Sequence, residues 1–591
     1  MRKYLNVQPV LPSFLSEKDD LVVHEWIPVG TESGVHRRGP DMVEMARWSM
    51  HYLIHNPQRP RGCECRFNIS LLDCPPARAD DEHDPIAVGD TESRMELEFV
   101  YMREMTAMVE GRDVENAIRS RLNTYVRADG LCWCSPRALG TNDTEPAAMP
   151  WTTGYLLRST AERYLHTHDE RDQKMCRRLV DGLKSLASAR DDLLWYEGGL
   201  AAWRDGVWQS ACQDHYPSII DALIRYWEIS GEQDVLRFAE AMADGIVQGV
   251  QKNLGGSRIQ PDGSHCTTNC HLVMRPVMGV AQVGAATGNA RYIEWARRTY
   301  EFTRAHGTDW GWYPENLVAP FEYQSWSETC VTADMVECAV ALARARFSEY
   351  WDHVERAVRN YLAEAQFFLT PEFVKLYRRT HESHPDDCER GLTLMRKFEG
   401  GFIARQRPND WVYHYEGKNQ INMMGCCPPS GMHALYLAWA NTIIERDGRV
   451  FVNMALDRDS EAARVTTHAP QSGRIDVEVR KSAEFHLRPP SWTQRDQVRV
   501  WWNDKQIAPE WHSDYVKFAD AKAGDQLRLE YPLPRFSQRV PIGHDSSMEM
   551  FEARWIGNDV EEVSPRGRII PIFDDSRFTR STPSLSLNEK I

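Results

Sequence analysis

Two short segments of the sequence carry side chains that can bind a metal ion together. One is SETC at residues 327–330 and the other is GCCPP at residues 425–429. Adjacent cysteines rarely close a relaxed disulfide with each other, because the peptide between them imposes poor geometry, so they are either incidental or ligands. Three thiolates and one carboxylate form a closed set of four donors that zinc accepts in a tetrahedron, and soft sulfur disfavours magnesium and calcium. The candidate zinc ligands are Glu328, Cys330, Cys426 and Cys427.

Other polar residues could contact a substrate, and each has a structural alternative. Asp90 and Glu92 stand at the start of an expected helix, where a carboxylate serves as a cap as readily as it binds a hydroxyl group. His215 lies at the entry to another helix. His414 and Tyr415 come shortly before the adjacent cysteines and could reach the same site, although an isolated histidine is often structural.

The overall composition is that of a large folded protein and does not suit a nucleic-acid partner. A length of 591 residues predicts two or three structural units, one of them large enough to enclose a deep pocket. The formal charge of -15 argues against binding a phosphate backbone, because that affinity comes mainly from clustered Lys and Arg. The 20 tryptophans could offer flat faces to sugar rings, although a single Trp is more often core. These features favour a small neutral or weakly charged partner such as a glycan.

The start of the chain and its cysteines predict a cytoplasmic protein. Residues 1–20 lack the continuous apolar stretch and the small-residue cleavage site of a secretory signal. The 14 cysteines are not spaced like a disulfide framework and suit a reducing compartment. No run approaches the roughly 18 apolar residues that span a bilayer, so we expect no membrane insertion. The oligomeric state stays open, with a homodimer as one alternative.

Apolar residues between residues 38 and 446 recur with helical period, interrupted by clusters of Gly, Pro and Asn. Several segments share a pattern in which a helix, a short Gly-containing turn and a second helix follow one another. Six such pairs that close on themselves form an (α/α)6 toroid around a funnel, and an open solenoid is the alternative. We expect twelve helices, at residues 42–55, 92–109, 114–127, 154–166, 169–188, 216–229, 233–252, 271–286, 290–306, 328–347, 351–367 and 430–443.

After residue 446 the period changes to that of strands. Segments such as SGRIDVEVRK and DQLRLEYPL alternate apolar and polar residues, which predicts an antiparallel β-sandwich. SMEMFEARWIG and GRIIPIF are expected to form a last strand pair. We therefore expect a mainly α protein, a toroid followed by a sandwich. Its four parts are an extended segment at 1–37, the catalytic domain at 38–446, the β-sandwich domain at 447–573 and a polar tail at 574–591.

The candidate ligand segments resemble those of a known family. SETCVTADMVECA and GCCPPSGMHALY are similar to the two metal-ligand segments of glycoside hydrolase family 127, the β-L-arabinofuranosidase family. NCHLVMRPVMGVAQVGAATGNARY resembles the helix of that family that begins with a substrate-contacting histidine, here His271. FHLRPPSWTQRDQVRVWWNDKQI resembles a strand pattern of the family's sandwich. The resemblance covers roughly residues 90–540 and implies the same (α/α)6 barrel and β-sandwich.

The resemblance implies a retaining glycoside hydrolase that acts on a terminal β-L-arabinofuranoside or a related sugar. Cys426 would be the nucleophile, held as a thiolate by zinc, and a glutamate in the loop before SETC would be the acid/base. Glu315 and Glu322 both qualify. Glu315 is favoured because it lies farther from the metal ligands and follows an aromatic run, including Trp312, that could form a sugar platform.

Departures from the family pattern fall at positions where the sugar would be recognised. Ser430 follows Cys-Cys-Pro-Pro where Asn is usual, and an expected His is replaced around Ser218. Two other classes of function therefore stay open. One is another sugar-active enzyme on the same toroid, such as an epimerase or an unsaturated-uronide hydrolase, and the other is a carbohydrate-binding protein without catalysis. We find no Gly-rich phosphate loop at a strand-to-helix junction, so no nucleotide cofactor is expected.

Overall fold

The fold is described from a computed structural model of the chain. The described residues are 25–28, 39–73, 89–134, 145–196, 202–209, 219–250, 259–267, 269–317, 325–415, 417–543 and 548–573. The expected tail at 574–591 lies outside them.

All twelve expected helices coincide with helices of the structure. The eleventh, expected at 351–367, is divided into α11, a π-helical turn at Val358–Leu362 and the short α12 (Ala363–Ala365). Two helices were not expected, α13 (Pro371–Thr380) and α14 (Pro385–Met395). The twelve are α1 (Met42–His55), α2 (Asp90–Thr106), α3 (Arg112–Tyr125), α4 (Pro150–Thr167), α5 (Glu170–Leu186), α6 (Ile220–Ser230), α7 (Gln233–Val247), α8 (Cys270–Thr287), α9 (Ala290–Ala305), α10 (Thr329–Arg344), α11 (Tyr350–Ala357) and α15 (Cys427–Thr442).

Capping residues explain where several of these helices begin. The Asp41 carboxylate accepts hydrogen bonds from the backbone N–H groups of Val43 and Glu44 at the start of α1. Asn269 and Asn289 cap α8 and α9 in the same way, each through its side-chain oxygen. Such caps satisfy backbone donors that have no partner inside the helix.

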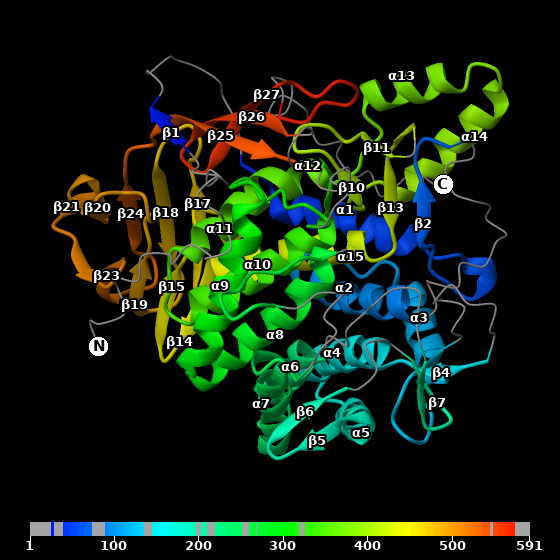
Figure 1. Cartoon of the computed structure of the whole chain (residues 1–591). Helices are drawn as coiled ribbons and strands as arrows, with labels where there is room; N and C mark the ends of the chain where they lie inside the picture. Colours follow the sequence, from blue (N-terminus) through cyan, green and yellow to red (C-terminus); the bar gives the residue numbers. More distant parts are fainter. Residues whose placement is uncertain are drawn as a thin grey trace.

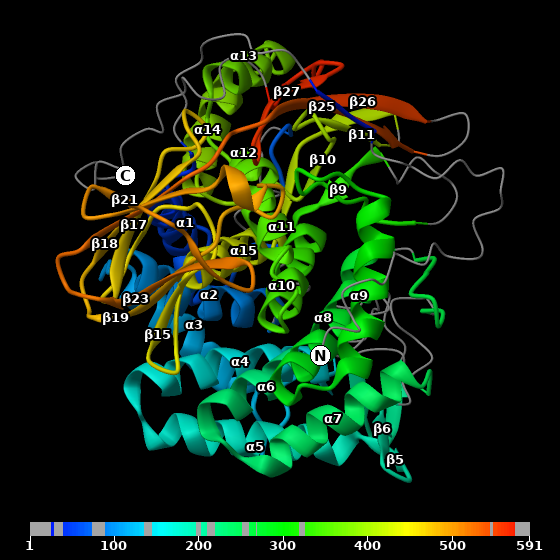
Figure 2. The same ribbon diagram turned by 90° about the vertical axis from the view of Figure 1, so that its left-hand side faces the viewer.

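Six of the helices pack in a fixed order, in which α2, α4, α6, α8, α10 and α15 each contact the next and α15 contacts α2. The other six pack on these: α3 on α2, α5 on α4, α7 on α6, α9 on α8, α11 on α10, and α1 on both α2 and α15. The burial pattern follows this division. Nearly every side chain of α10 from Thr329 to Ala343 is buried, whereas α3 buries one face with Val114, Ile118 and Leu122. Figures 1 and 2 show the helices grouped beside the C-terminal strands.

The C-terminal strands form two facing sheets that share one hydrophobic cluster. Alternate residues such as Val450 and Val452 of β15, or Ile475 and Val477 of β18, point into that cluster. The five-stranded sheet is β14 (Ile443–Arg446), β15 (Arg449–Val452), β19 (Ala483–Leu487), β23 (Tyr515–Ala521) and β22 (Glu510–His512). The six-stranded sheet is β16 (Arg458–Asp459), β17 (Ala463–Thr467), β18 (Arg474–Val479), β24 (Gln526–Glu530), β20 (Arg499–Trp502) and β21 (Lys505–Ile507).

One pairing in this region differs from the expected antiparallel arrangement. β15 and β19 are parallel, with Val450 opposite Phe485. Between them the chain crosses to the other sheet, where it forms β16, β17 and β18, and then returns in the same direction as β15. Such a crossover connection permits parallel neighbours, whereas a direct hairpin does not.

A separate four-stranded sheet has the order β1 (Glu25–Pro28), β25 (Arg535–Ile542), β26 (Glu549–Ile556) and β27 (Asp559–Ser564). SMEMFEARWIG contains β26, as expected, but GRIIPIF at 567–573 is not a strand, and β27 takes that place beside β26. Asp410 instead accepts hydrogen bonds from the backbone N–H groups of Ile569 and Ile570. The apolar side chains that suggested a strand, including Ile570 and Ile572, are buried against the helical core.

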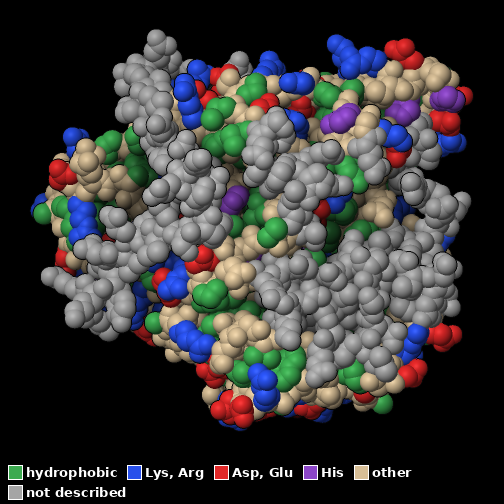
Figure 3. All heavy atoms as spheres, viewed as in Figure 1, with side chains coloured by type: hydrophobic (Ala, Val, Ile, Leu, Met, Phe, Trp, Pro, Cys, Tyr) green, Lys and Arg blue, Asp and Glu red, His purple; other side chains and the backbone are tan. Residues whose placement is uncertain are grey.

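Several other short strands join loops near the helix ends. β13 (Asn422–Met424) pairs with β2 (Asn68–Ser70), β11 (Tyr413–Tyr415) with β12 (Lys418–Gln420), and β9 (Ser327–Glu328) with β10 (Arg405–Gln406). The surface drawn in Figure 3 mixes acidic and basic side chains over the part shown in colour. Within the described residues, no helix combines the length and the apolar character needed to cross a bilayer.

Candidate metal centre

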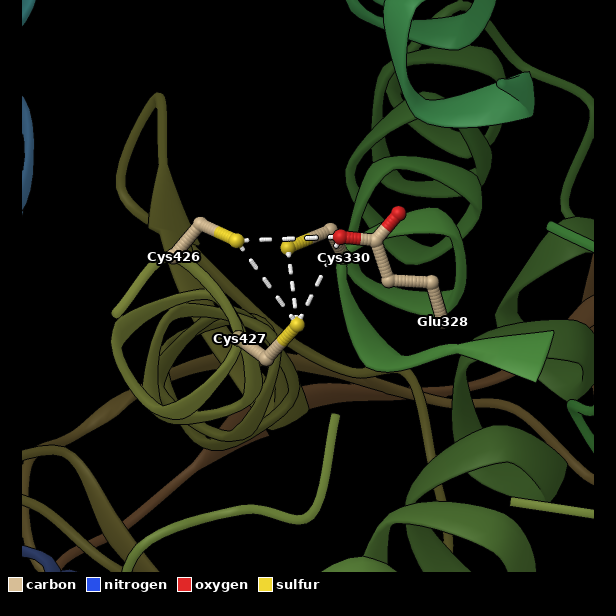
Figure 4. Close-up of side chains that lie close together, drawn as sticks. All are labelled: Glu328, Cys330, Cys426 and Cys427. Carbon is tan, nitrogen blue, oxygen red and sulfur yellow. Dashed lines mark hydrogen bonds between the residues drawn. The ribbon is translucent and has the colours of Figure 1, made fainter. Parts of the chain in front are cut away.

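The four candidate ligands meet in one buried cluster (Figure 4). The Sγ atoms of Cys330 and Cys427 are 3.4 Å apart and those of Cys426 and Cys427 are 3.8 Å apart. Oε1 of Glu328 lies 3.6 Å from Sγ of Cys426 and 3.5 Å from Sγ of Cys427. A tetrahedral ion with bonds of about 2.3 Å to sulfur and about 2.0 Å to oxygen needs donor separations of about 3.5–3.8 Å. The cluster therefore has the spacing and the donor types of a tetrahedral metal site.

Local structure brings these four side chains together. Glu328 ends β9 and precedes α10, and Cys330 lies in the first turn of that helix. Cys426 and Cys427 stand at the start of α15, which packs against α10. Gly425 is required just before them, because a Cβ at this position would lie 2.5 Å from Oγ1 of Thr91.

The electrostatics of the cluster favour a bound cation. Burial, followed by the charge of Cys426, raises the pKa of the Glu328 carboxyl well above its usual value. Burial likewise raises the pKa of the Cys330 and Cys427 thiols. Hydrogen bonds from these two thiols lower the pKa of Cys426, and the nearby charges of Arg94 and His271 lower it further. Crowded buried acids of this kind hold protons until a cation replaces them, which is the behaviour of a metal site.

Glu315 lies in the same region and is held by two partners. Its Oε2 accepts hydrogen bonds from Trp326 Nε1 at 2.6 Å and from Arg405 Nε at 2.5 Å. Its Oε1 accepts from Arg405 Nη2 at 2.5 Å. This bidentate ion pair fixes the orientation of the carboxylate. Glu322, the other candidate acid, lies outside the described residues.

His271 and Asp90 point to the same part of the molecule. Nδ1 of His271 is 2.5 Å from Oδ2 of Asp334, and Nε2 is buried without a hydrogen-bond partner among the described residues. Asp90 accepts hydrogen bonds from Nε of Arg94 at 2.9 Å and from Nε1 of Trp151 at 2.7 Å. The Trp151 ring also packs edge-on against His271.

Two other candidate residues have contacts that suit a structural role. Glu92 is a capping residue, because its carboxylate accepts from the backbone N–H of Gly89 at 3.1 Å and from Arg121 at 2.8 Å. Trp312 is fully buried, so the expected sugar platform is instead part of the core. Its indole N–H donates to the backbone oxygen of Gln406 at 3.0 Å.

Two further candidates, His414 and Tyr415, lie on the β11–β12 hairpin. His414 is exposed, with Nδ1 3.3 Å from Oδ1 of Asn419 across the hairpin. Tyr415 packs edge-on against Trp326, the residue that also donates to Glu315. His215 lies outside the described residues.

A pocket beside the cluster contains Ser430, noted above as a departure from the family pattern, and several residues that the sequence did not single out. Among its lining residues are Arg94, Tyr155, Arg275, Asp334, Ser430 and His433. Asp334 follows Cys330 by about one helical turn, and Ser430 follows Cys427 by less than one turn. The guanidinium of Arg94 lies 4.4 Å from the centre of the Tyr155 ring. Only the Asp90 and Arg94 pair had a local signal, the i, i+4 spacing of opposite charges on a helix.

Buried ion pairs line part of this pocket. Arg158 forms 2.8 Å ion pairs with Asp221 and with Glu337, and Arg275 forms one with Asp221 at the same distance. His433 lies 3.2 Å from Glu98. These residues come from the six mutually packed helices, so part of the pocket is lined by charges that are already paired.

The fold, in which packed helix pairs are followed by a β-sandwich, is shared with solved structures. The chain is similar to a GH127 β-L-arabinofuranosidase from Geobacillus stearothermophilus T6, with a TM-score of 0.57 and 14% identity over 89% of this chain and 86% of the other. A second GH127 β-arabinofuranosidase gives a TM-score of 0.59 and 13% identity over 91% of this chain and 85% of the other. A structure described as a glycoside hydrolase gives 0.55 and 13% over 80% and 77%.

The resemblance to glycoside hydrolase family 127 is therefore confirmed in three dimensions, with a sequence that has diverged strongly. Comparison of the sequence with protein-family models and with curated proteins found no match.

Proposed function

We propose that this chain is a retaining glycoside hydrolase that cleaves a terminal β-L-arabinofuranoside or a related sugar, with zinc in the cluster of Glu328, Cys330, Cys426 and Cys427. One observation carries the assignment of the nucleophile. Cys426 is 8% exposed, whereas Cys330 and Cys427 are both 0% exposed. This difference supports Cys426 as the residue of the cluster that a substrate reaches.

Zinc fits the donor set better than other common ions, because three thiolates and one carboxylate suit its tetrahedral preference. When bound, it would keep the thiols ionised at neutral pH. The residues of the chain then divide the remaining work. Cys426 supplies the attacking sulfur, and the lowered pKa of its thiol favours the thiolate.

The reaction has two steps. In the first, the Cys426 thiolate forms a C–S bond to the anomeric carbon, the glycosidic C–O bond breaks, and the departing oxygen takes a proton from the acid/base glutamate. In the second, water attacks the same carbon, its proton passes to that glutamate, and the sulfur leaves as a thiolate. Two displacements at one carbon retain its configuration.

Glu315 is our choice for the acid/base, with Glu322 as the alternative. Glu315 is buried, and its charge is among the causes that raise the pKa of the metal-ligand Glu328, after burial and Cys426. Its contact with Arg405 suits the second step, in which an ionised carboxylate accepts a proton from water. In the first step one carboxyl oxygen must exchange Arg405 for the substrate oxygen.

Four further residues are proposed to bind the sugar. His271 presents its unpaired Nε2 next to the Cys426 side of the cluster, and Asp90 orients Arg94 and Trp151. Tyr415 and His414 are proposed for the leaving-group side, because Tyr415 contacts the Trp326 ring beside Glu315.

The architecture supports the same proposal. The six helices that contact one another in order, each covered by a further helix, support an (α/α)6 toroid. The proposed domains keep their boundaries, with the catalytic domain at 38–446 and the sandwich at 447–573, although the first sandwich strand β14 already begins at Ile443. All twelve described cysteines are free, which supports a reducing compartment such as the cytoplasm.

Covalent labelling tests the proposal. A cyclophellitol-type probe of L-arabinofuranosyl configuration should modify one peptide, the one that holds GCCPPSGMHAL, and fragmentation should locate the adduct on Cys426. The Cys338→Ser variant should label as wild type, because Cys338 is fully buried and outside the cluster. An adduct on Glu315 or Glu322 would replace the thiolate with a conventional carboxylate nucleophile.

A further inference from the structure

We propose that Asn269 is a positioning residue that makes Glu328 bind the metal through one oxygen. The inference rests on the proposed metal site and adds a residue outside the four ligands. It follows from the way in which one amide side chain contacts two elements at once.

The contacts divide the two oxygens of Glu328 between different partners. Oε1 faces the sulfurs of Cys426 and Cys427, at 3.6 and 3.5 Å. Oε2 accepts a hydrogen bond from Nδ2 of Asn269 at 3.2 Å. Figure 4 shows one carboxylate oxygen turned toward the sulfurs and the other turned away from them.

The orientation of the Asn269 amide is fixed by its other end. Oδ1 accepts a hydrogen bond from the backbone N–H of His271 at 2.9 Å, where Asn269 caps α8. Because an amide has an acceptor on one side and donors on the other, this cap directs the NH₂ group to Glu328. The backbone of Asn269 is itself held by Oγ1 of Thr267, which accepts from its N–H at 3.1 Å and donates to its carbonyl oxygen at 3.0 Å.

This arrangement has a consequence for the metal. A carboxylate whose second oxygen is already hydrogen-bonded presents a single donor atom, so the site keeps four ligands. Partners that orient metal ligands in this way commonly contribute about 10–100-fold to metal affinity. The same side chain also fixes the first turn of α8, which carries His271, so it couples the metal ligand to a proposed substrate-binding residue.

The test uses Asn269→Ser with Asn289→Ser as its matched control. Serine caps helices about as well as asparagine, but it is too short to reach Glu328. Asn289 caps the neighbouring helix α9 with the same bond, from the N–H of Arg291 at 3.0 Å, and contacts no ligand of the cluster. The two variants therefore make the same change at a helix start, and only one removes the contact with Glu328.

Zinc affinity is measured by titrating metal-free protein with Zn²⁺ against a chromophoric chelator. Asn269→Ser should bind zinc about 10–100-fold more weakly than wild type, and Asn289→Ser should match wild type. Replacement of zinc by Co²⁺ gives a second readout. Freed from Asn269, Glu328 can bind through both oxygens, and the visible absorption of tetrahedral cobalt should weaken in Asn269→Ser alone.

Equal zinc affinities and equal cobalt spectra for the two variants would overturn the role of Asn269 and leave it a helix cap. A wild-type protein that binds no zinc in the same titration would instead overturn the metal site itself, and this role with it. The two failures are thus distinguished within one experiment.

Discussion

The replacement of Cys427 by Ser tests the metal site most directly. Cys427 is 0% exposed, and its sulfur lies 3.4 Å from that of Cys330 and 3.5 Å from Oε1 of Glu328. Zinc bound by four ligands contributes on the order of 10–16 kcal/mol at pH 7. One ligand therefore accounts for about 3 kcal/mol, and Cys427→Ser should weaken zinc binding by roughly a hundredfold.

The pH dependence of binding gives a sharper magnitude. The pKa values of Glu328, Cys330 and Cys427 are raised, mainly by burial, and that of Cys426 is lowered. In metal-free protein near neutral pH the thiols of Cys330 and Cys427 hold protons, which zinc must release. Affinity should therefore rise with pH, with a slope of log K of about two or more, and it should fall as the pH is lowered. Cys427→Ser removes one of these protons, so its slope should be about one smaller.

The assay is a chelator-competition titration of metal-free protein at several pH values, with zinc content from elemental analysis. Cys338→Ser is the control, because Cys338 lies on the same helix as Cys330, is also fully buried and is no member of the cluster. Both variants bury a hydroxyl in place of a thiol, but only Cys427→Ser should change the affinity and the slope. If Cys427→Ser kept stoichiometric zinc with wild-type affinity and slope, Cys427 would not be a ligand.

Two further predictions concern the acid/base and the buried charges. Glu315→Gln should slow hydrolysis of substrates with poor leaving groups by about 10²–10⁴-fold and spare activated aryl glycosides. Its zinc content should stay unchanged, and Glu322→Gln should match wild type. The reverse pattern would transfer the acid/base role to Glu322. Glu337→Ala should lower the free energy of unfolding by about 3–5 kcal/mol in denaturant titrations, because it leaves Arg158 and Arg275 buried without that carboxylate. Glu228→Ala breaks a partly exposed pair with Arg225 and should cost about 1 kcal/mol or less, so equal losses for the two variants would show that burial of the network does not matter.

The helices and the metal ligands could be predicted because their signals are local. Helical period marks all twelve helices, and capping residues mark the starts of several, since both signals depend on neighbours within a few positions. The ligands could be found because Glu-x-Cys and Cys-Cys each place two donors side by side before a helix. Glu92 shows the limit of this approach, because its local sequence suits a cap and a hydroxyl contact equally. The structure shows the cap.

Contacts between distant segments could not be predicted from the sequence. Arg158 and Glu337 are separated by 179 positions, and nothing local links them. The aromatic run around Trp312 is equally compatible with a sugar platform and with the protein core. The indole is fully buried, which favours the core. Likewise Ile570 and Ile572 of GRIIPIF are buried, but this segment does not pair with a neighbouring strand. The N–H groups of Ile569 and Ile570 bond to the Asp410 side chain, and that of Ile572 bonds to the backbone oxygen of Asn409.

The charges around the site suit the proposed reaction. A divalent ion with three thiolates and one carboxylate carries a formal charge of +2 − 4 = −2. Arg94 does not cancel it, because Arg94 is paired with Asp90, and the single charge of Arg405 beside Glu315 is too small to do so. Glycoside cleavage passes through a transition state with oxocarbenium character, in which the sugar gains positive charge. A site with net negative charge stabilises that state more than it stabilises the neutral substrate, and differential stabilisation of this kind is what accelerates a reaction. The same charge disfavours an anionic sugar, so the cluster and its paired arginines together favour a neutral terminal residue.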